Sequence, residues 1–279
     1  NNIEDDIYVA VMGGGYGGRD DKVGSALFVV NLEDNITPGK LEKVISIKDE
    51  VNLPIVNSVP GTPVVITPDV ARGIKYKGAL VYVNDFEGKI TKFNLTNMEN
   101  DGSGKNIKLY DSTILLNIKA DRNNGRYQYH SMDAGIGRTS KNFWMFSGTG
   151  DYERLTSKDA NIDNIMFGFR DKDYPLFKEY SDPITIMHGL EKCMDTTGDT
   201  LGVKCPLTTK DVSRTARSKK NLGWFIKLPH SQKVTAEPTI ANGLVYYPIF
   251  EPSASANQCS LGLALICAVD DECGKNVSS

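Results

Sequence analysis

The sequence has few histidines and lacks the short motifs that organise common active sites. Its three histidines, His130, His188 and His230, are isolated and form neither an HxH nor an HExxH spacing. A Gly-x-Ser-x-Gly element is missing, and no two carboxylates stand out by their spacing as an acid/base pair. We therefore expect a protein that is not an enzyme, in which each histidine is a surface or packed polar residue.

Long apolar runs and an excess of basic charge are absent as well. No run approaches the roughly 20 apolar residues that a membrane-spanning helix needs, so we expect no transmembrane segment. The formal net charge of -3 provides no basic field, which argues against nucleic acid as the main partner. The chain begins without a Met or a secretory signal, and we expect a processed product or a fragment of a longer protein.

Helical periodicity is the third absence. No long stretch carries apolar residues at i, i+3, i+4 and i+7 between capping residues. With 279 residues, of which 40% are hydrophobic, the chain can bury a substantial core. The sequence therefore predicts one all-β domain over residues 1–279.

The segment 61–95 shows most clearly what is present instead of helices. Val64–Ile66 is a short apolar run, and Gly78–Asn84 (GALVYVN) is rich in β-branched residues. Asp85 to Gly88 supplies turn residues, and Lys89–Leu95 alternates in a way that predicts a strand with a wetter face. Together these runs predict an antiparallel meander of an inner, a middle and an outer strand.

The same pattern recurs along the chain. Gly24–Leu32 (GSALFVVNL) repeats the middle strand, with Ile7–Met12 before it and Leu41–Ile47 after it. Repeats of about 40–50 residues with four short strands each are typical of a β-propeller, and we expect about five to seven blades of four antiparallel strands. The last blade is expected to contain Gly223–Leu228, Thr235–Ile240, Gly243–Phe250 and Leu261–Asp270.

A glycine-rich loop, Gly13–Gly18, follows the first strand. Such a loop binds phosphate when a helix begins after it, because the helix N-terminus supplies the donors. Here the next element is the strand Gly24–Leu32, so nucleotide binding is not expected. We interpret the glycines as positions where the backbone turns sharply between crowded blades.

The five cysteines indicate an oxidising, extracytoplasmic compartment. Cys193 and Cys205 enclose a polar loop, and a disulfide between them would staple a loop insertion over residues 190–212. Cys259 and Cys273 are the further disulfide candidates. Cys267 lies inside an apolar strand, where a buried thiol and a disulfide are both consistent with the sequence. The spacings do not match a zinc site.

Taken in order, these motifs resemble the C-terminal propeller of the PilY/PilC-type proteins found at the tips of type IV pili. The resemblance covers most of the chain and rests on GGGYGG with GSALFVVNLED, GTPVVITPD with GALVYVNDFEGKITKFNL, FWMFSGTGDYERL, DNIMFGFRD and GWFIKLPHSQKVTAEPTIANGLVYYPIFEPSASANQCSLG. It implies a quinoprotein-like propeller that is secreted and sits at the pilus tip or outer-membrane surface of a bacterium, together with minor pilins. Such proteins promote pilus assembly by opposing retraction, and they mediate adhesion to host cells or surfaces.

Many proteins of this family carry a calcium-binding loop, rich in Asp and Gly, before the strand that corresponds to Gly78–Asn84. In this sequence the loop reads TPDVARGIKYKG, with Asp69 as its remaining carboxylate and positive charge at Arg72, Lys75 and Lys77. Too few oxygen ligands remain to hold Ca²⁺ against this charge. We therefore expect calcium to be lost at this loop and no other cofactor to be bound.

We expect three loops to mediate adhesion. They are Asp20–Val23 (with Asp21), Asn97–Lys105 (with Asp101) and Cys193–Cys205. The Asp101 carboxylate is a potential calcium ligand, but its loop lacks the ligand spacing of an EF-hand, and we expect a solvated surface loop. Two other functions use similar scaffolds. A quinone-dependent dehydrogenase would need an adjacent-cysteine pair and a cluster of carboxylates for calcium, neither of which we find in the sequence. A lectin-like propeller that binds glycans is compatible with adhesion.

Overall fold

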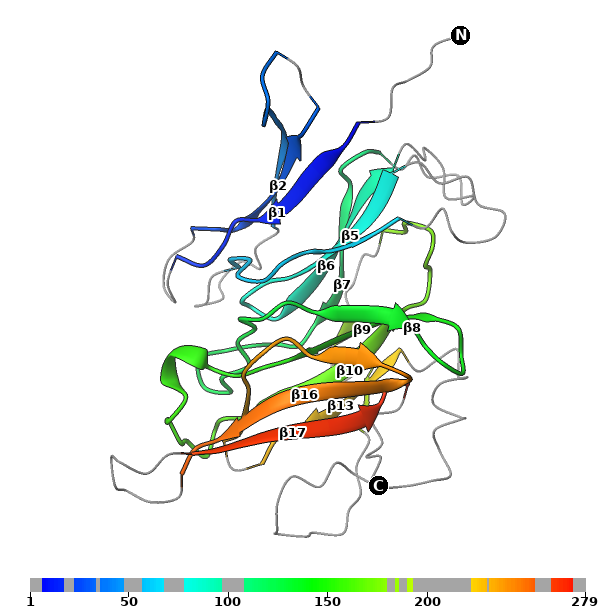
Figure 1. Ribbon diagram of the computed structural model, residues 1–279. Helices are drawn as coiled ribbons and strands as arrows, with labels where there is room; N and C mark the ends of the chain where they lie inside the picture. The colour runs from blue at the N-terminus through cyan, green and yellow to red at the C-terminus, as the bar shows by residue number, and fades with distance from the viewer. Residues whose placement is uncertain are drawn as a thin grey trace.

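The computed structural model describes residues 7–17, 23–33, 36–47, 57–67, 78–96, 108–179, 184–185, 190–192, 222–229, 231–253 and 262–272. These residues form β-strands and one short 3-10 helix, Tyr152–Arg154, so the prediction of an all-β chain is confirmed (Figure 1). In this described part of the chain, no helix has the length and apolar character needed to cross a bilayer.

Two sheets come from the N-terminal part of the chain. The first has the strand order β1-β2-β3, with β1 Val9–Gly13, β2 Ala26–Asn31 and β3 Leu41–Ser46. The second has the order β11-β7-β6-β5-β4. Its antiparallel strands are β4 Val64–Ile66, β5 Gly78–Asn84, β6 Lys89–Thr96 and β7 Ser112–Asn117, and β11 Ile184–Thr185 joins β7 in parallel.

Two further sheets follow. The third has the order β12-β13-β10-β9-β8, with β8 Asp133–Ile136, β9 Phe143–Gly148, β10 Ile165–Asp171, β12 Leu190–Lys192 and β13 Gly223–Lys227. In the fourth sheet, β16 Leu244–Glu251 pairs with β17 Leu263–Asp270 along one edge. Along its other edge it pairs with β14 Lys233–Val234 and β15 Thr239–Ala241.

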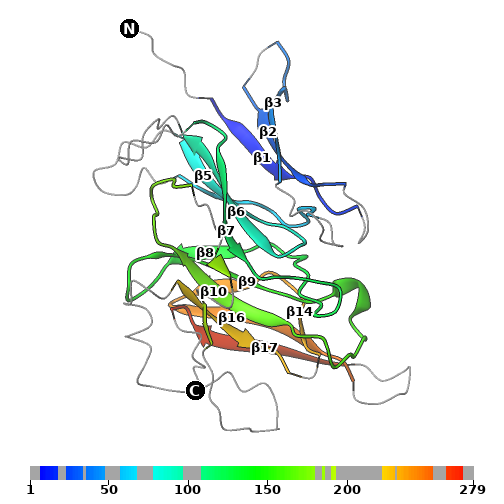
Figure 2. The same cartoon turned by 180° about the vertical axis from the view of Figure 1, so that it is seen from behind.

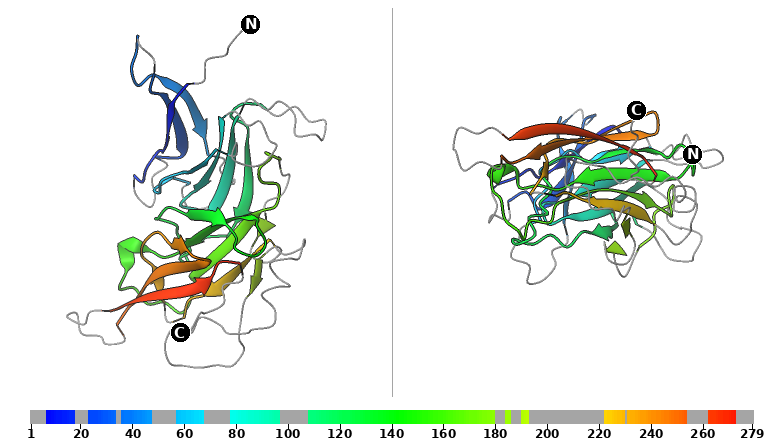
Figure 3. Two further views of the ribbon diagram at one scale, coloured as in Figure 1. Left: turned by 45° about the vertical axis from the view of Figure 1, so that its right-hand side comes forward. Right: turned by 90° about the horizontal axis from the view of Figure 1, so that it is seen from below.

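Successive sheets pack face to face, and Figures 2 and 3 show the first and fourth sheets at opposite ends of the stack. Three apolar cores lie between them: Val29 with Val81, Tyr82 with Phe167, and Trp224 with Tyr247 are representative members. The strands alternate their side chains between two faces, so an inner strand such as β5 serves two cores. This arrangement is β-propeller-like, although the four sheets of the described residues form no closed ring, and the expected count of five to seven blades is not confirmed.

The expectation that Gly223–Leu228 opens the last blade is wrong. β13 pairs with β10, with Phe225 opposite Phe167, and so belongs to the third sheet. Trp224 is buried there, and its Nε1 donates a hydrogen bond to the carbonyl oxygen of Asp271 at 3.0 Å. Order along the chain does not reveal this pairing because a long segment separates β13 from its partner strand.

The prediction that Lys89–Leu95 has a more solvated face is also wrong, because all eight residues of β6 are buried. Lys92 faces the third sheet, where its ammonium pairs with the Asp171 carboxylate and donates to the Leu176 carbonyl at 2.7 Å. The Tyr82 hydroxyl donates to the same Asp171 carboxylate at 2.9 Å. Lys92 in this strand therefore marks an ion pair between two sheets and not a solvated surface.

The glycine-rich loop after β1 brings two segments into close contact. A Cβ atom at Gly13 would lie 2.4 Å from Cγ1 of Val59. Gly15 has a φ of 85°, and its N–H donates to the Val59 carbonyl at 2.9 Å. A Cβ atom at Gly14 would lie 2.5 Å from the Gly24 carbonyl oxygen, so the expected crowding is found at Gly13 and Gly14, whereas Gly15 has open space and serves the turn through its positive φ.

Candidate binding surface

Loops from three sheets meet at one end of the fold and bring aromatic side chains together. The antiparallel registers place the β5–β6 turn beside the end of β7, and the start of β8 beside the end of β9. The aromatic residues on these connections are Tyr16 after β1, Phe86 in the β5–β6 turn, Tyr127 and Tyr129 between β7 and β8, and Tyr152 after β9.

Two buried rings form the base of this cluster. Phe86 and Tyr127 stack with ring centroids 4.7 Å apart and an interplanar angle of 9°, and neither is exposed. The Phe86 N–H donates to the Ser58 carbonyl at 2.8 Å, which fixes the turn against the segment before β4. The base is therefore rigid, because packing and a backbone hydrogen bond hold the same residue.

Three tyrosines reach solvent beside this base: Tyr16 and Tyr129 contact Phe86, and Tyr152 contacts Tyr129. The ring centroid of Tyr129 is 5.0 Å from that of Phe86 and 5.3 Å from that of Tyr16, both with edge-to-face geometry. Tyr16 and Tyr129 are half-buried, and Tyr152 is 50% exposed. The ring of Tyr152 also meets His130 edge-on at 5.4 Å. We call Tyr16, Tyr129, Tyr152 and His130 the tyrosine surface.

Two carboxylates hold the tyrosine hydroxyls in place. The Tyr16 hydroxyl donates to Glu153 Oε1 at 3.0 Å, and the Tyr129 hydroxyl donates to Asp151 Oδ1 at 3.3 Å. Asp151 also accepts from Arg154 Nε at 2.9 Å. The two tyrosine bonds join residues 137 and 22 positions apart, so the orientation of the rings is set by tertiary contacts.

The charges around the tyrosine surface balance. Asp151 and Glu153 contribute two formal negative charges, and Arg154 and Lys233 contribute two positive charges. Burial lowers the pKa of Lys233 to about 8, and the nearby Asp151 carboxylate opposes this shift. Burial also lowers the pKa of His130, which keeps this side chain neutral near pH 7.

Beneath the cluster, the β5–β6 turn buries three ionisable groups. The Lys89 ammonium pairs with the Glu87 carboxylate and lies 3.9 Å from Asp85 Oδ2. Burial raises the pKa of Asp85 to about 7, although Lys89 acts in the opposite direction. Gly88, with a φ of 77°, completes the turn that the sequence predicts. The turn thus carries a carboxyl group that titrates near neutrality.

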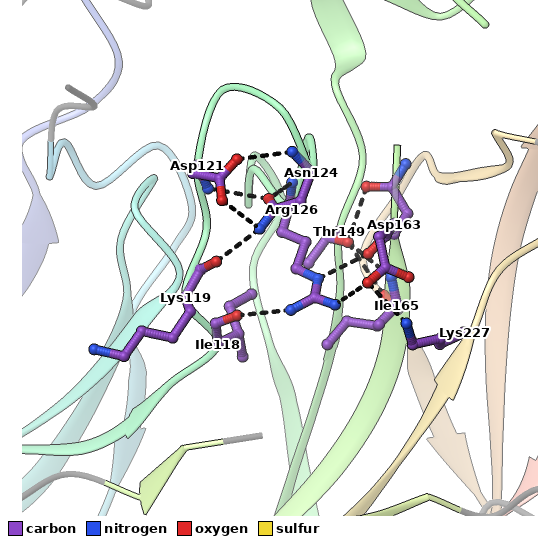
Figure 4. A network of polar contacts seen from close by, with 10 residues as sticks. Ile118, Lys119, Asp121, Asn124, Arg126, Thr149, Asp163, Ile165 and Lys227 are labelled. Atoms are coloured by element: carbon purple, nitrogen blue, oxygen red, sulfur yellow. Dashed lines mark hydrogen bonds and ion pairs between the residues drawn. The ribbon is translucent and has the colours of Figure 1, made fainter. Parts of the chain in front are cut away.

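A second polar network lies on the β7–β8 connection (Figure 4). The Arg126 guanidinium donates to the Ile118 carbonyl at 3.2 Å and to the Asp163 carbonyl at 2.7 Å, and it pairs with the Asp163 carboxylate. Lys227 Nζ lies 2.9 Å from the same carboxylate. These contacts tie the second sheet to the third, and we assign them a structural role.

Most of the residues singled out from sequence lie outside the described residues: Asp20, Asp21, Asp69, Asp101, Cys193, Cys205, Cys259, Cys273, His188 and His230. The predictions made for them, including calcium loss at Asp69, stay predictions. Cys267 is described and is disulfide-bonded, which answers the question that the sequence left open for this residue. In the described ranges, no group of three or more His, Cys, Asp or Glu side chains is placed to hold a metal ion.

Sequence reasoning did not single out the tyrosine surface. Tyr16 and Tyr152 stand in GGGYGG and GTGDYERL, where the glycines and not the tyrosines drew the interpretation. Tyr16 lies between two glycines and Tyr152 follows Gly150 by two residues, and this was an available signal because glycines near an aromatic residue allow close approach of loops.

Packed antiparallel sheets with long loops at their ends define an all-β protein of propeller-like fold. No protein-family model matches the sequence, and no curated protein matches it. Among solved structures, the chain is similar to the crystal structure of the Pseudomonas aeruginosa PilY1 C-terminal domain, with a TM-score of 0.60 and 14% sequence identity. The match covers 97% of this chain and 57% of that chain, so this chain spans little more than half of its neighbour. The resemblance drawn from the sequence motifs is confirmed at the level of the fold.

Proposed function

We propose that this chain is part of a non-catalytic, pilus tip-associated protein of a bacterium, which supports type IV pilus assembly by opposing retraction and mediates adhesion. The fold shared with the PilY1 C-terminal domain over 97% of this chain carries the proposal. The order of sequence motifs along the chain supports it independently. Minor pilins are the proposed partners, and the proposed location is the cell exterior, at the pilus tip or outer-membrane surface.

The architecture suits a binding module. The strands form the packed core between sheets, and the loops at their ends can vary in sequence and length without loss of that core. The tyrosine surface is the part of these loops where side chains from several sheets converge, and we propose that adhesion uses it. We further propose that the chain performs no chemistry and uses no calcium at the loop that contains Asp69.

Deletion of the gene in the bacterium that makes this protein tests the pilus role. We expect few or no surface pili, and we expect pili to return when the retraction motor is inactivated in the same strain. Minor pilins should co-purify with the full-length protein from sheared pili. Normal piliation and normal adhesion in the deletion strain would contradict the proposal.

A further inference from the structure

We propose that the tyrosine surface binds a neutral carbohydrate. This inference rests on the proposed adhesive function and gives its ligand a chemical class. The observation behind it is the convergence of three solvent-reaching tyrosine rings from loops of different sheets, beside the exposed Glu153 carboxylate that the Tyr16 hydroxyl orients.

The rings provide the stacking element. Tyr152 is 50% exposed, and Tyr16 and Tyr129 reach solvent beside it. The C–H groups of a pyranose ring pack on an aromatic face because the face carries partial negative charge and these C–H groups carry partial positive charge. The buried Phe86 ring supports Tyr16 and Tyr129, and Tyr152 packs against Tyr129 and His130, so little conformational entropy is lost when a ligand binds.

The exposed Glu153 carboxylate provides polar recognition. It accepts a hydrogen bond from the Tyr16 hydroxyl, which fixes its orientation at the edge of the rings, whereas Asp151 is only 5% exposed and accepts from Tyr129 and Arg154. A carboxylate has lone pairs for more than one donor, and sugar hydroxyls are suitable donors. Rings flanked by oriented acceptors match the two sides of a sugar, one apolar and one rich in hydroxyl groups.

The charge balance selects against ionic ligands. Asp151 and Glu153 are offset by Arg154 and Lys233, and His130 is neutral near pH 7. A surface without net charge offers no attraction to a sulfated or sialylated glycan, nor to a lysine-rich peptide.

The test is binding of fluorescently labelled 279-residue chain to an array that carries neutral oligosaccharides, sialylated and sulfated glycans, and Lys/Arg-rich peptides. We expect binding to at least one class of neutral oligosaccharide. Tyr152→Ala should then weaken this binding about tenfold, since loss of one stacking ring costs roughly the free energy of a tenfold change in affinity. Tyr152→Phe keeps the ring and should bind within about threefold of the parent chain.

The matched control is Tyr246→Ala, because Tyr246 is a 36% exposed tyrosine on β16, outside the tyrosine surface. It should bind like the parent chain, and circular dichroism should give the same spectrum for all variants. Binding confined to charged glycans or to cationic peptides, no binding to any neutral oligosaccharide, or equal losses in Tyr152→Ala and Tyr246→Ala would overturn the inference.

The two proposals fail separately. A deletion strain that loses pili and adhesion, together with an array negative for neutral oligosaccharides, leaves the pilus role intact and removes the ligand class. A positive array that depends on Tyr152, together with normal piliation and adhesion in the deletion strain, supports the ligand class and removes the pilus role.

Discussion

Strand β2 of the first sheet and strand β5 of the second sheet have nearly the same sequence but different surroundings. In β2 the side chains alternate between buried and half-buried positions, whereas in β5 every residue after Gly78 is buried. Leu27 and Val29 face the second sheet, as Leu80 and Tyr82 face the third. The difference lies on the other face, where Val81 packs on the first sheet and Phe28 meets no sheet among the described residues.

Position in the stack, and not the strand's own sequence, therefore decides how much of a strand is buried. The first sheet presents Met12 and Val44, the pair partners of Phe28, with exposures of 47% and 44%. The fourth sheet presents Ile266 with an exposure of 76% on its outer face. We therefore expect substitutions to destabilise the inner sheets on both faces and the end sheets on one face only.

We expect the greatest loss of stability when a lysine is placed on the face of β5 that packs on the first sheet. Val81→Lys places a charge between two packed sheets and should cost more than about 4 kcal/mol in the free energy of unfolding, or prevent folding. Phe28→Lys should cost about 1 kcal/mol, because the lysine can reach solvent. Urea unfolding followed by tryptophan fluorescence measures both. Equal losses in the two variants would mean that the outer face of the first sheet is covered.

The buried ion pair between the second and third sheets should give the next largest effect. Lys92→Met leaves the Asp171 carboxylate buried without its cation and should cost about 3–5 kcal/mol. The control is Lys40→Met, since Lys40 is 52% exposed and pairs with Glu42 at 3.5 Å on the surface. This control should change the free energy of unfolding by no more than about 1 kcal/mol. A small effect of Lys92→Met in the same urea experiment would show that the pair contributes little.

The fourth sheet allows the same comparison within one strand. Val269 on β17 is fully buried against the third sheet, and Val269→Ala should cost about 2 kcal/mol through lost apolar burial and the cavity left behind. Ile266→Ala, on the outer face, should stay within about 0.5 kcal/mol. Thermal unfolding of the two variants at one protein concentration compares them. If Ile266→Ala is the more destabilising, the outer face of β17 takes part in a contact within or between chains.

The smallest effect concerns the buried turn below the tyrosine surface. The pKa of Asp85 is about 7 in the folded chain and that of an ordinary aspartate is 3.8, so between these values the folded state holds a proton that the unfolded state has lost. Stability should therefore fall as pH rises from about 4 to about 7, by up to about 1.4 kcal/mol for each pH unit. Lys89 and Glu87 are the charged groups that face Asp85.

Urea titrations across this pH range measure the slope, and Asp85→Asn provides the control because an amide does not titrate. Burial also raises the pKa of Asp271, to about 6, which adds a slope of the same sign that the variant should keep. An unchanged slope in Asp85→Asn would show that Asp85 titrates normally.

Local sequence determined the strands and the tight turn of this protein. Val64–Ile66 and Gly78–Asn84 are strands with the predicted bounds, and the Asp85–Gly88 turn forms as predicted, because β-branched runs and Asp/Gly turn chemistry act over a few residues. Cys267 shows the limit of such reasoning, since its partner choice depends on geometry and not on spacing.

Tertiary structure alone decided which strands share a sheet, which faces are buried and where the candidate site lies. β13 joins β10 across a long insertion, and Lys92 is buried because Asp171 of another sheet meets it. The tyrosine surface forms because loops from three sheets end at one place, with Tyr16 bonded to Glu153 far along the chain. Such contacts depend on how the sheets stack. The pattern of residues within one strand or loop does not specify which distant residue that strand or loop will contact.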